Sequence, residues 1–318
     1  MDVVSAAQVN QLLDFPGLIA ALAQAFGGSL TAPPRHHHSL GPSGPLQATQ
    51  LVMPAWSAAA PGAGLFLGTK IVNVFPGNRS VGLPAVLGQY LLQSGETGAP
   101  LALIDGTSLT HWRTAATSAL ATIYLARSDA SHLLMVGSGA LAPHLIRAHA
   151  SVRPLKRVTL WNHHRAGAEK LAASLQPAPW NVEVMDNLEA AVREADIISC
   201  ATLSALPLVL GQWLQPGTHL DLVGAFSLAM RECDDAALLR SRIYIDTPAA
   251  LSEGGEVAQA IRNGVLMATR VAGDLAALCT GKVAGRGHAD ETTLFKSIGA
   301  SIEDLAAAIL VWHRLGKA

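Results

Sequence analysis

The chain has 318 residues, of which 50% are hydrophobic and 14% charged, and its formal net charge at pH 7 is −1. This length suffices for two domains with hydrophobic cores, while the near-neutral charge gives no general attraction to nucleic acid or anionic lipid. No apolar run is long enough to span a bilayer, and the N-terminal Met-Asp-Val-Val lacks signal-peptide features. The three cysteines lack Cys-x-x-Cys spacing. We therefore expect a cytoplasmic protein with reduced thiols.

The first 105 residues predict a mostly β domain, because Gly and Pro interrupt short apolar segments in this part of the chain. The strand candidates are residues 47–53, 65–75 and 86–92. Residues 107–127 follow as an Ala-rich stretch with a Thr cap and almost no helix breakers. This stretch predicts one long helix.

From residue 131 to about residue 246, strand and helix candidates alternate, which is typical of a doubly wound parallel sheet. The strand candidates are 132–137, 157–161, 182–185, 196–200, 219–224 and 242–246, and the helix candidates are 139–150, 165–175 and 187–194. We expect residues 292–299 and a helix over 301–315 to fold back onto the first domain. The predicted α/β architecture therefore has a mostly β domain, 1–115 with 292–318, and a doubly wound α/β domain, 116–291.

The junction between the first strand and helix of this region carries a dinucleotide-binding pattern. Residues 137–142 read Gly-Ser-Gly-Ala-Leu-Ala and fit G-x-G-x-x-A. Gly137 permits a tight turn, Gly139 lets the backbone approach a pyrophosphate, and Ala142 lets the helix pack closely on the strand. An ordinary surface turn is the alternative, but the strand–turn–helix context favours a phosphate site that includes Ser138, Ala140 and Leu141.

The residues after the second strand candidate indicate which cofactor is preferred. An acidic residue is expected about twenty residues past the glycine turn, but that position holds Asn162, and no Asp or Glu occurs from 138 to 168. His163, His164 and Arg165 come next. An acidic side chain would bind the ribose 2′-hydroxyl and repel a 2′-phosphate, so its absence favours NADP(H), with NAD(H) still possible.

Two isolated cations occur in apolar surroundings. Lys70 alternates with Val72 and Val74 on one face of a strand candidate, and Arg113 is the only formal charge between residues 106 and 126. Burying an unpaired ammonium costs several kcal/mol, so a carboxylate meets Lys70, its pKa falls, or the strand face is open to solvent. A guanidinium needs an anion. Each could simply extend to water, but together they favour an anionic substrate pocket.

The run His36-His37-His38 suggests a metal site at first sight. Consecutive residues of an extended chain point to alternate sides, so three neighbours cannot easily share one ion. We therefore predict no metal, and we expect this run, His38 included, to line a pocket beside Arg35.

Over nearly its whole length the chain resembles the ornithine cyclodeaminase and mu-crystallin family of NAD(P)-dependent proteins. The resemblance implies a Rossmann domain and a dimer-forming β domain that the C-terminal helix completes. It rests on motifs in a fixed order: Pro34-Arg35, Met53-Pro-Ala, Gly68-Thr-Lys-Ile-Val-Asn, Phe75-Pro-Gly-Asn, Thr97-Gly-Ala-Pro-Leu-Ala, Leu109-Thr, Arg113-Thr-Ala-Ala-Thr-Ser-Ala, the glycine turn, and Thr293-Leu-Phe-Lys-Ser-Ile-Gly.

By this resemblance Lys70 and Arg113, with Arg35, correspond to the side chains that bind the substrate carboxylate, and Thr114 to one that contacts the cofactor phosphates. Lys70 and Arg113 are the predicted catalytic residues. The remaining predicted substrate contacts are His38, Met53 and Phe226, and the remaining predicted cofactor contacts are Ala201, Thr202, Val223, Lys296 and Gly299.

Two departures from the cyclodeaminases bear on the activity. Those enzymes have an Asp where this chain has Phe226, after Gly224-Ala225, and a Glu where it has Leu51. Without these carboxylates the δ-ammonium of ornithine would be desolvated without a partner. The Gly-Ala-Phe variant with the Arg-His-His-His segment resembles the Δ1-pyrroline-2-carboxylate reductases, which implies reduction of a cyclic ketimine carboxylate to L-proline, and of the six-membered homologue. The alternatives are ornithine cyclodeaminase, reductive amination of a 2-oxo acid as in alanine dehydrogenases, and a mu-crystallin-like binding protein.

Overall fold

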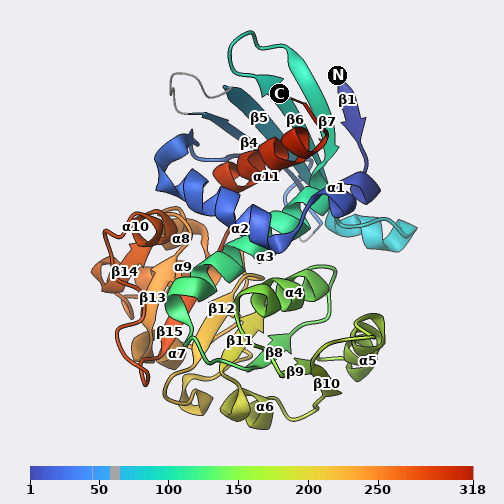
Figure 1. Ribbon diagram of the computed structural model, residues 1–318. Coiled ribbons are helices and arrows are strands. Elements are labelled where there is room, and N and C mark those ends of the chain that lie inside the picture. Colours follow the sequence, from blue (N-terminus) through green and yellow to red (C-terminus); the bar gives the residue numbers. More distant parts are fainter. Residues whose placement is uncertain (45, 58–64, 318) are drawn as a thin grey trace. The chain divides into compact units, whose positions relative to one another are not determined.

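The computed structural model describes residues 1–44, 46–57 and 65–317 (Figure 1). The chain divides into two compact units, one of residues 1–113 with 300–318 and one of residues 114–299. The first unit is built on a mixed sheet and the second on a parallel sheet. The predicted α/β architecture with two domains is thereby confirmed.

The sheet of the first unit has seven strands in the order β1-β7-β6-β5-β4-β2, with β3 also paired to β4. The predicted strands are all present, and β4 continues beyond the predicted end at residue 53. The bounds are β1 Asp2–Val4, β2 Leu30–Thr31, β3 His36–Leu40, β4 Ala48–Ser57, β5 Phe66–Val74, β6 Val86–Ser94 and β7 Pro100–Asp105, with short helical turns η1 Ala25–Ser29 and η2 Pro76–Val81.

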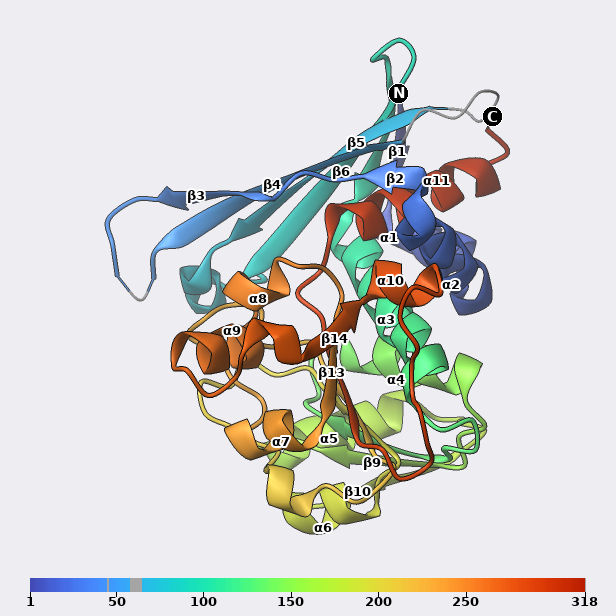
Figure 2. The same cartoon turned by 90° about the vertical axis from the view of Figure 1, so that its left-hand side faces the viewer.

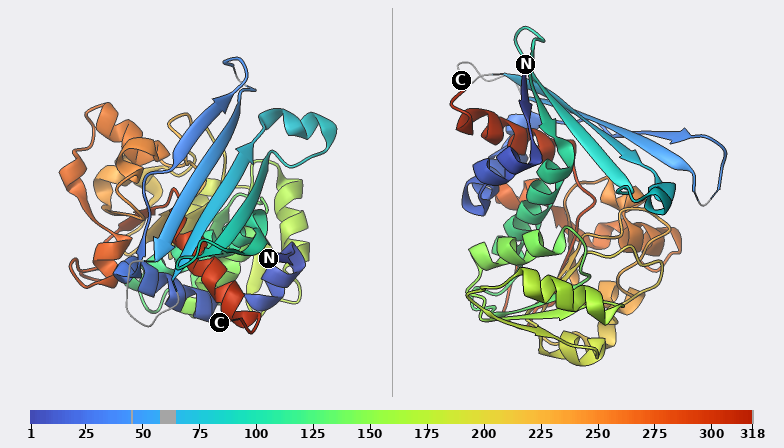
Figure 3. Two further views of the ribbon diagram at one scale, coloured as in Figure 1. Left: turned by 90° about the horizontal axis from the view of Figure 1, so that it is seen from above. Right: turned by 90° about the vertical axis from the view of Figure 1, so that its right-hand side faces the viewer.

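Helices α1 (Ala6–Leu12), α2 (Phe15–Gln24) and α11 (Ser301–Arg314) lie on one face of this sheet, and no described helix of the first unit covers the other, which we call the bare face (Figures 2 and 3). The alternation along β5 explains this, because Phe66, Lys70 and Val72 are buried whereas Ile71 is 40% exposed. Successive side chains of a strand point to opposite faces. The lysine predicted among apolar residues therefore points to the helix-covered face.

Helix α3 (Gly106–Leu125) is the long helix that the Ala-rich stretch predicts. It begins where the Asp105 carboxylate accepts a hydrogen bond from the Ser108 backbone N–H at 2.6 Å, which satisfies one of the free N–H groups of a helix start. Its first two turns belong to the first unit and the rest to the second. Arg113 lies at the end of the first of these parts.

The second unit contains an eight-stranded sheet in the order β10-β9-β8-β11-β12-β15-β13-β14, in which every pairing is parallel. The strands are β8 His132–Val136, β9 Arg157–Trp161, β10 Asn181–Val184, β11 Ile197–Cys200, β12 His219–Leu222, β13 Arg242–Ile245, β14 Val271–Asp274 and β15 Thr293–Lys296. The helices are α4 Ala142–Val152, α5 Arg165–Ser174, α6 Leu188–Glu194, α7 Asp235–Arg240, α8 Ala250–Glu253, α9 Gly255–Arg262 and α10 Leu275–Cys279, with η3 Gly211–Trp213 and η4 Ala268–Arg270.

One part of the predicted domain division is wrong. Residues 292–299 do not join the first unit, because β15 pairs with β12 on one side and β13 on the other. All four residues of β15 are buried, as expected of a strand covered on both faces of a parallel sheet. Only the segment from Ala300 onward returns to the first unit.

No helix in the described ranges is long and apolar enough to cross a membrane.

Candidate active site

The carboxyl ends of four neighbouring strands of the second unit lie at one edge of its sheet. Cys200 of β11 pairs with Val136 of β8 and with Leu222 of β12, and Leu222 pairs with Lys296 of β15. The predicted cofactor residues come at or directly after these positions, so the sheet brings them to one edge. Open parallel sheets bind ligands at this edge, where the strand order reverses between β8 and β11.

The glycine turn connects β8 to α4, in the strand–turn–helix context that the sequence predicts. Gly137 has a φ of +107°, which residues with a Cβ rarely adopt, and its N–H donates to the Trp161 carbonyl at 2.9 Å. Gly139 and Ala140 are exposed, and a Cβ at Gly139 would meet no atom within 4 Å. No side chain of the described residues caps α4, so this turn fits a phosphate group bound by backbone N–H groups.

The adenosine end of the predicted site lies after β9. The Asn162 side chain donates to the His164 carbonyl at 2.8 Å, and His163 and His164 are exposed with their rings 4.9 Å apart. Arg165 already pairs with Glu169 at 2.8 Å and with Asp186 at 2.6 Å. A 2′-phosphate would therefore have to compete with two carboxylates for this guanidinium.

The other predicted cofactor residues differ in accessibility. Ala201 and Thr202, directly after β11, are partly exposed, whereas Thr114 and Val223 are buried. Gly299 is also buried, and its N–H donates to Asp246 at 2.6 Å. The Lys296 side chain is fully buried and forms an ion pair of 3.0 Å with Glu256.

The two isolated cations of the first unit share one carboxylate partner, Asp304. Lys70 Nζ lies 2.7 Å from Asp304, and Arg113 Nε lies 3.0 Å from the same side chain. Arg113 also donates to Glu303 at 2.5 Å, and Lys70 donates to Thr110 at 3.4 Å. Lys70 is 1% exposed and Arg113 5%. Of the three options for Lys70, a carboxylate partner is therefore the one observed, and open solvent is excluded.

Burial also shifts the titration of Lys70. Desolvation, followed by the nearby Arg113 guanidinium, lowers the pKa of Lys70 from 10.5 to about 8, and the carboxylates of Asp304 and Glu303 oppose that shift. The second option, a lowered pKa, therefore holds together with the first. A lysine in this range remains mostly protonated at pH 7 and can exchange a proton near neutral pH.

Three of the other predicted substrate residues lie on or next to strands β3 and β4 of the first unit. Met53 is buried and pairs directly with Lys70 across β4 and β5. Arg35 immediately precedes β3, whose first residue pairs with Val52, next to Met53. His38 is exposed and pairs with Gln50, farther along β4. In the second unit, Phe226 is 38% exposed.

Sequence reasoning missed several buried acids that contact the predicted site residues. Glu303 and Asp304 lie in the first turn of α11. The helix dipole favours acidic side chains at this position, where they are normally exposed. Glu232 and Glu256 lie in the second unit, near the carboxyl ends of β11, β12 and β15. The sequence signal available for Glu303 and Asp304 was a pair of adjacent acids at the start of a mostly apolar helix.

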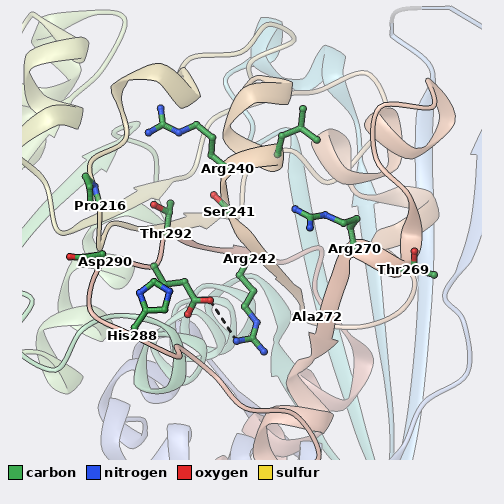
Figure 4. Close-up of a pocket in the computed structure, with 12 residues that line it drawn as sticks. Pro216, Arg240, Ser241, Arg242, Thr269, Arg270, Ala272, His288, Asp290 and Thr292 are labelled. Carbon is green, nitrogen blue, oxygen red and sulfur yellow. Dashed lines mark ion pairs between the residues drawn. The ribbon is translucent and has the colours of Figure 1, made fainter.

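A separate hollow of about 700 Å³ lies at the amino ends of β13, β14 and β15 (Figure 4). Its arginines are largely engaged within the protein: Arg242 pairs with Glu291 at 3.6 Å, and Arg240 donates to the Gly211 carbonyl at 2.6 Å. It lies at the strand ends opposite to those that carry the glycine turn. The predicted cofactor residues are not among those that line it.

The chain is similar to known proteins along almost its whole length. The model of the ornithine cyclodeaminase/mu-crystallin family matches residues 2–318. A Δ1-pyrroline-2-carboxylate reductase from Colwellia psychrerythraea is 38% identical over 321 residues, 99% of each chain, and the ketimine reductase mu-crystallin of Mus musculus is 35% identical over 82% of this chain and 79% of its own. The structure of Thermococcus litoralis Δ1-pyrroline-2-carboxylate reductase with NADH and L-proline superposes with a TM-score of 0.92 at 30% identity, covering 99% of this chain and 97% of that one.

Proposed function

Because the chain belongs to the ornithine cyclodeaminase/mu-crystallin family, we propose that this NAD(P)H-dependent oxidoreductase reduces a cyclic ketimine carboxylate, Δ1-pyrroline-2-carboxylate, to L-proline. The six-membered homologue is the second proposed substrate. The observation that carries the proposal is the pair of buried cations, Lys70 and Arg113, held on a strand and a helix by carboxylates of α11. Relatives named as pyrroline-2-carboxylate and ketimine reductases support the same reaction.

The segment after β12 argues against a cyclodeaminase. Gly224 and Ala225 donate their N–H groups to Glu232, at 2.8 and 3.3 Å, and Phe226 follows. The carboxylate that would receive a second ammonium is therefore replaced by an aromatic ring. At the other departure, Leu51 of β4 is likewise apolar. A diamino acid would lose the hydration of its side-chain ammonium without a new partner.

The proposed chemistry asks three things of this chain. A bound nicotinamide cofactor supplies the hydride. Lys70 and Arg113 bind the substrate carboxylate and fix the orientation of the ring. A rigid planar guanidinium and a nearby ammonium group are suited to this role. With a pKa of about 8, Lys70 is also suited to keep the imine nitrogen protonated, which leaves C2 electrophilic.

We propose NADP(H) as the preferred cofactor. The absence of an acid at Asn162 and the cluster of His163, His164 and Arg165 support the proposal. The ion pairs of Arg165 with Glu169 and Asp186 set a limit, because a 2′-phosphate must displace at least one of them. These pairs are exposed, and exposed ion pairs contribute little to stability, so displacement costs little.

We also propose a homodimer formed through the bare face of the first unit's sheet. Trp56, Ile71 and Leu87 are 40, 40 and 42% exposed on strands β4, β5 and β6, and Figure 3 (left) looks onto these strands. Apolar side chains gathered on one sheet face favour association. Light scattering after size-exclusion chromatography should give a dimer for the wild type and a monomer for Ile71→Glu, while Leu239→Glu in the second unit stays dimeric.

The reaction is tested with purified protein and NADPH, followed at 340 nm. We expect oxidation of NADPH with Δ1-pyrroline-2-carboxylate and none with pyruvate plus ammonia. Lys70→Ala and Arg113→Ala should raise KM or abolish turnover without changing the Kd for NADPH. The control is Lys317→Ala, which removes an exposed lysine. Release of ammonia from ornithine would overturn the proposal, and normal turnover by either variant would overturn that residue's role.

A further inference from the structure

Glu232 connects two loops at the edge of the sheet where the cofactor residues converge. One oxygen of its carboxylate accepts hydrogen bonds from the Thr202 N–H and hydroxyl, at 2.6 and 2.8 Å. The other oxygen accepts from the Gly224 and Ala225 N–H groups. Thr202 follows β11 and Gly224 follows β12, so one side chain fixes the backbone beyond two adjacent strands.

The packing at this point leaves no room for adjustment. Glu232 is 0% exposed. A Cβ at Gly224 would lie 2.0 Å from the Thr202 carbonyl oxygen and 2.5 Å from the Glu232 carboxylate, so the two loops touch directly and only glycine fits. Buried N–H groups need an acceptor, and a carboxylate is the strongest one available to a protein.

A second buried group holds Glu232 itself. Its backbone N–H donates to Glu256 at 2.6 Å, and Glu256 pairs with Lys296, the last residue of β15. All three side chains are fully buried. The chain Lys296–Glu256–Glu232 therefore links the carboxyl ends of β15, β11 and β12, the same edge that carries the predicted cofactor residues.

From this geometry we propose that Glu232 is a positioning residue for the cofactor: its carboxylate holds the loops of Thr202 and Gly224 in the conformation that binds the nicotinamide half. The assignment deepens the proposed function and rests on its cofactor, but not on the identity of the imine. Glu232 is thus not a substrate ligand. Its effect passes through the backbone that it holds.

The cost of burying Glu232 supports a role beyond simple packing. Desolvation raises the pKa of its carboxyl from 4.5 to about 7, although Lys296 opposes the shift. An apolar residue would avoid this penalty, but it would leave the four donor groups without an acceptor. A buried carboxyl group is retained where its hydrogen bonds determine one backbone conformation.

The test is Glu232→Gln, a substitution of equal size that removes the charge and turns an acceptor into a donor. We expect the Kd for NADPH, measured by fluorescence without substrate, to rise at least 10-fold in the folded variant. Two controls accompany it: Glu189→Gln, which neutralises an exposed Glu of α6, and Val192→Ala, which truncates a core residue of the same unit. Both should keep the wild-type Kd, although Val192→Ala lowers the melting temperature.

A folded Glu232→Gln variant with a Kd within twofold of the wild type would overturn the inference, because a purely structural residue behaves like Val192. If the variant does not fold, hydrogen exchange in the wild-type protein decides. The amides of Thr202 and Gly224 should then exchange as slowly as the core strands before cofactor is added, and fast local exchange would refute the assignment. A wild type that binds NADPH but reduces no imine would contradict the proposed substrate alone.

Discussion

Replacing Asp304 by Asn removes one charge on which two buried cations depend. Asp304 lies 2.7 Å from Lys70 and 3.0 Å from Arg113, and none of the three side chains is more than 7% exposed. Breaking a buried ion pair from one side costs about 3–5 kcal/mol, since the remaining charge stays out of water. Glu303 still contacts Arg113, so Lys70 bears most of the loss. We expect the free energy of unfolding to fall by about 3–5 kcal/mol.

Urea denaturation at pH 7, followed by circular dichroism, measures this loss. The matched control is Asp14→Asn, which breaks the exposed pair of Asp14 with Arg314. Asparagine can still accept the hydrogen bond from the Gly17 N–H that begins α2, so the control should lose less than about 1 kcal/mol. Equal small losses in the two variants would show that the buried carboxylate does not hold the cations as we argue.

Three further outcomes are expected. Between pH 8 and 10.5 Lys70 keeps its proton in the unfolded chain but releases it in the folded chain, because folding lowers its pKa to about 8. The free energy of unfolding should therefore rise with pH by about 3 kcal/mol across this window, compared with the variant Lys70→Met. Denaturation series at both ends measure this, and parallel curves would refute the lowered pKa. Arg165→Ala should weaken NADPH binding and leave NADH binding unchanged, and equal shifts of the two Kd values would remove Arg165 from the 2′-phosphate site. L-Proline should compete with the imine in steady-state kinetics and lose that competition in Arg113→Ala, and undiminished competition would mean that Arg113 does not bind the carboxylate.

The parallel sheet could be predicted because its signals are local. Buried strands appear as short apolar runs, and the glycine turn fixes where the first of them ends. The strand β15 was assigned to the wrong unit because its place between β12 and β13 is set by long-range pairing. Sequence separation hides such a contact.

Only part of the candidate site could be predicted, for the same reason. Lys70 and Arg113 are conspicuous because no acid lies near them in the sequence, whereas their partners lie on α11, at least 190 positions farther along the chain. Glu232 was missed because it lies in a polar segment with Arg231, Asp234 and Asp235. Nothing local distinguishes a buried carboxylate there from a solvated one.

Under the proposed function, the ion-pair partners of Lys70 and Arg113 also constrain the choice of substrate. Two cations and the two carboxylates of Glu303 and Asp304 form a buried group without net charge. A cyclic iminium carboxylate carries one charge of each sign, so it adds no net charge to this group, and its carboxylate can share the guanidinium of Arg113. Ornithine carries one further positive charge, for which the group has no spare carboxylate. Because an uncompensated buried charge costs several kcal/mol, the charge balance at α11 favours the imine independently of the segment at Phe226.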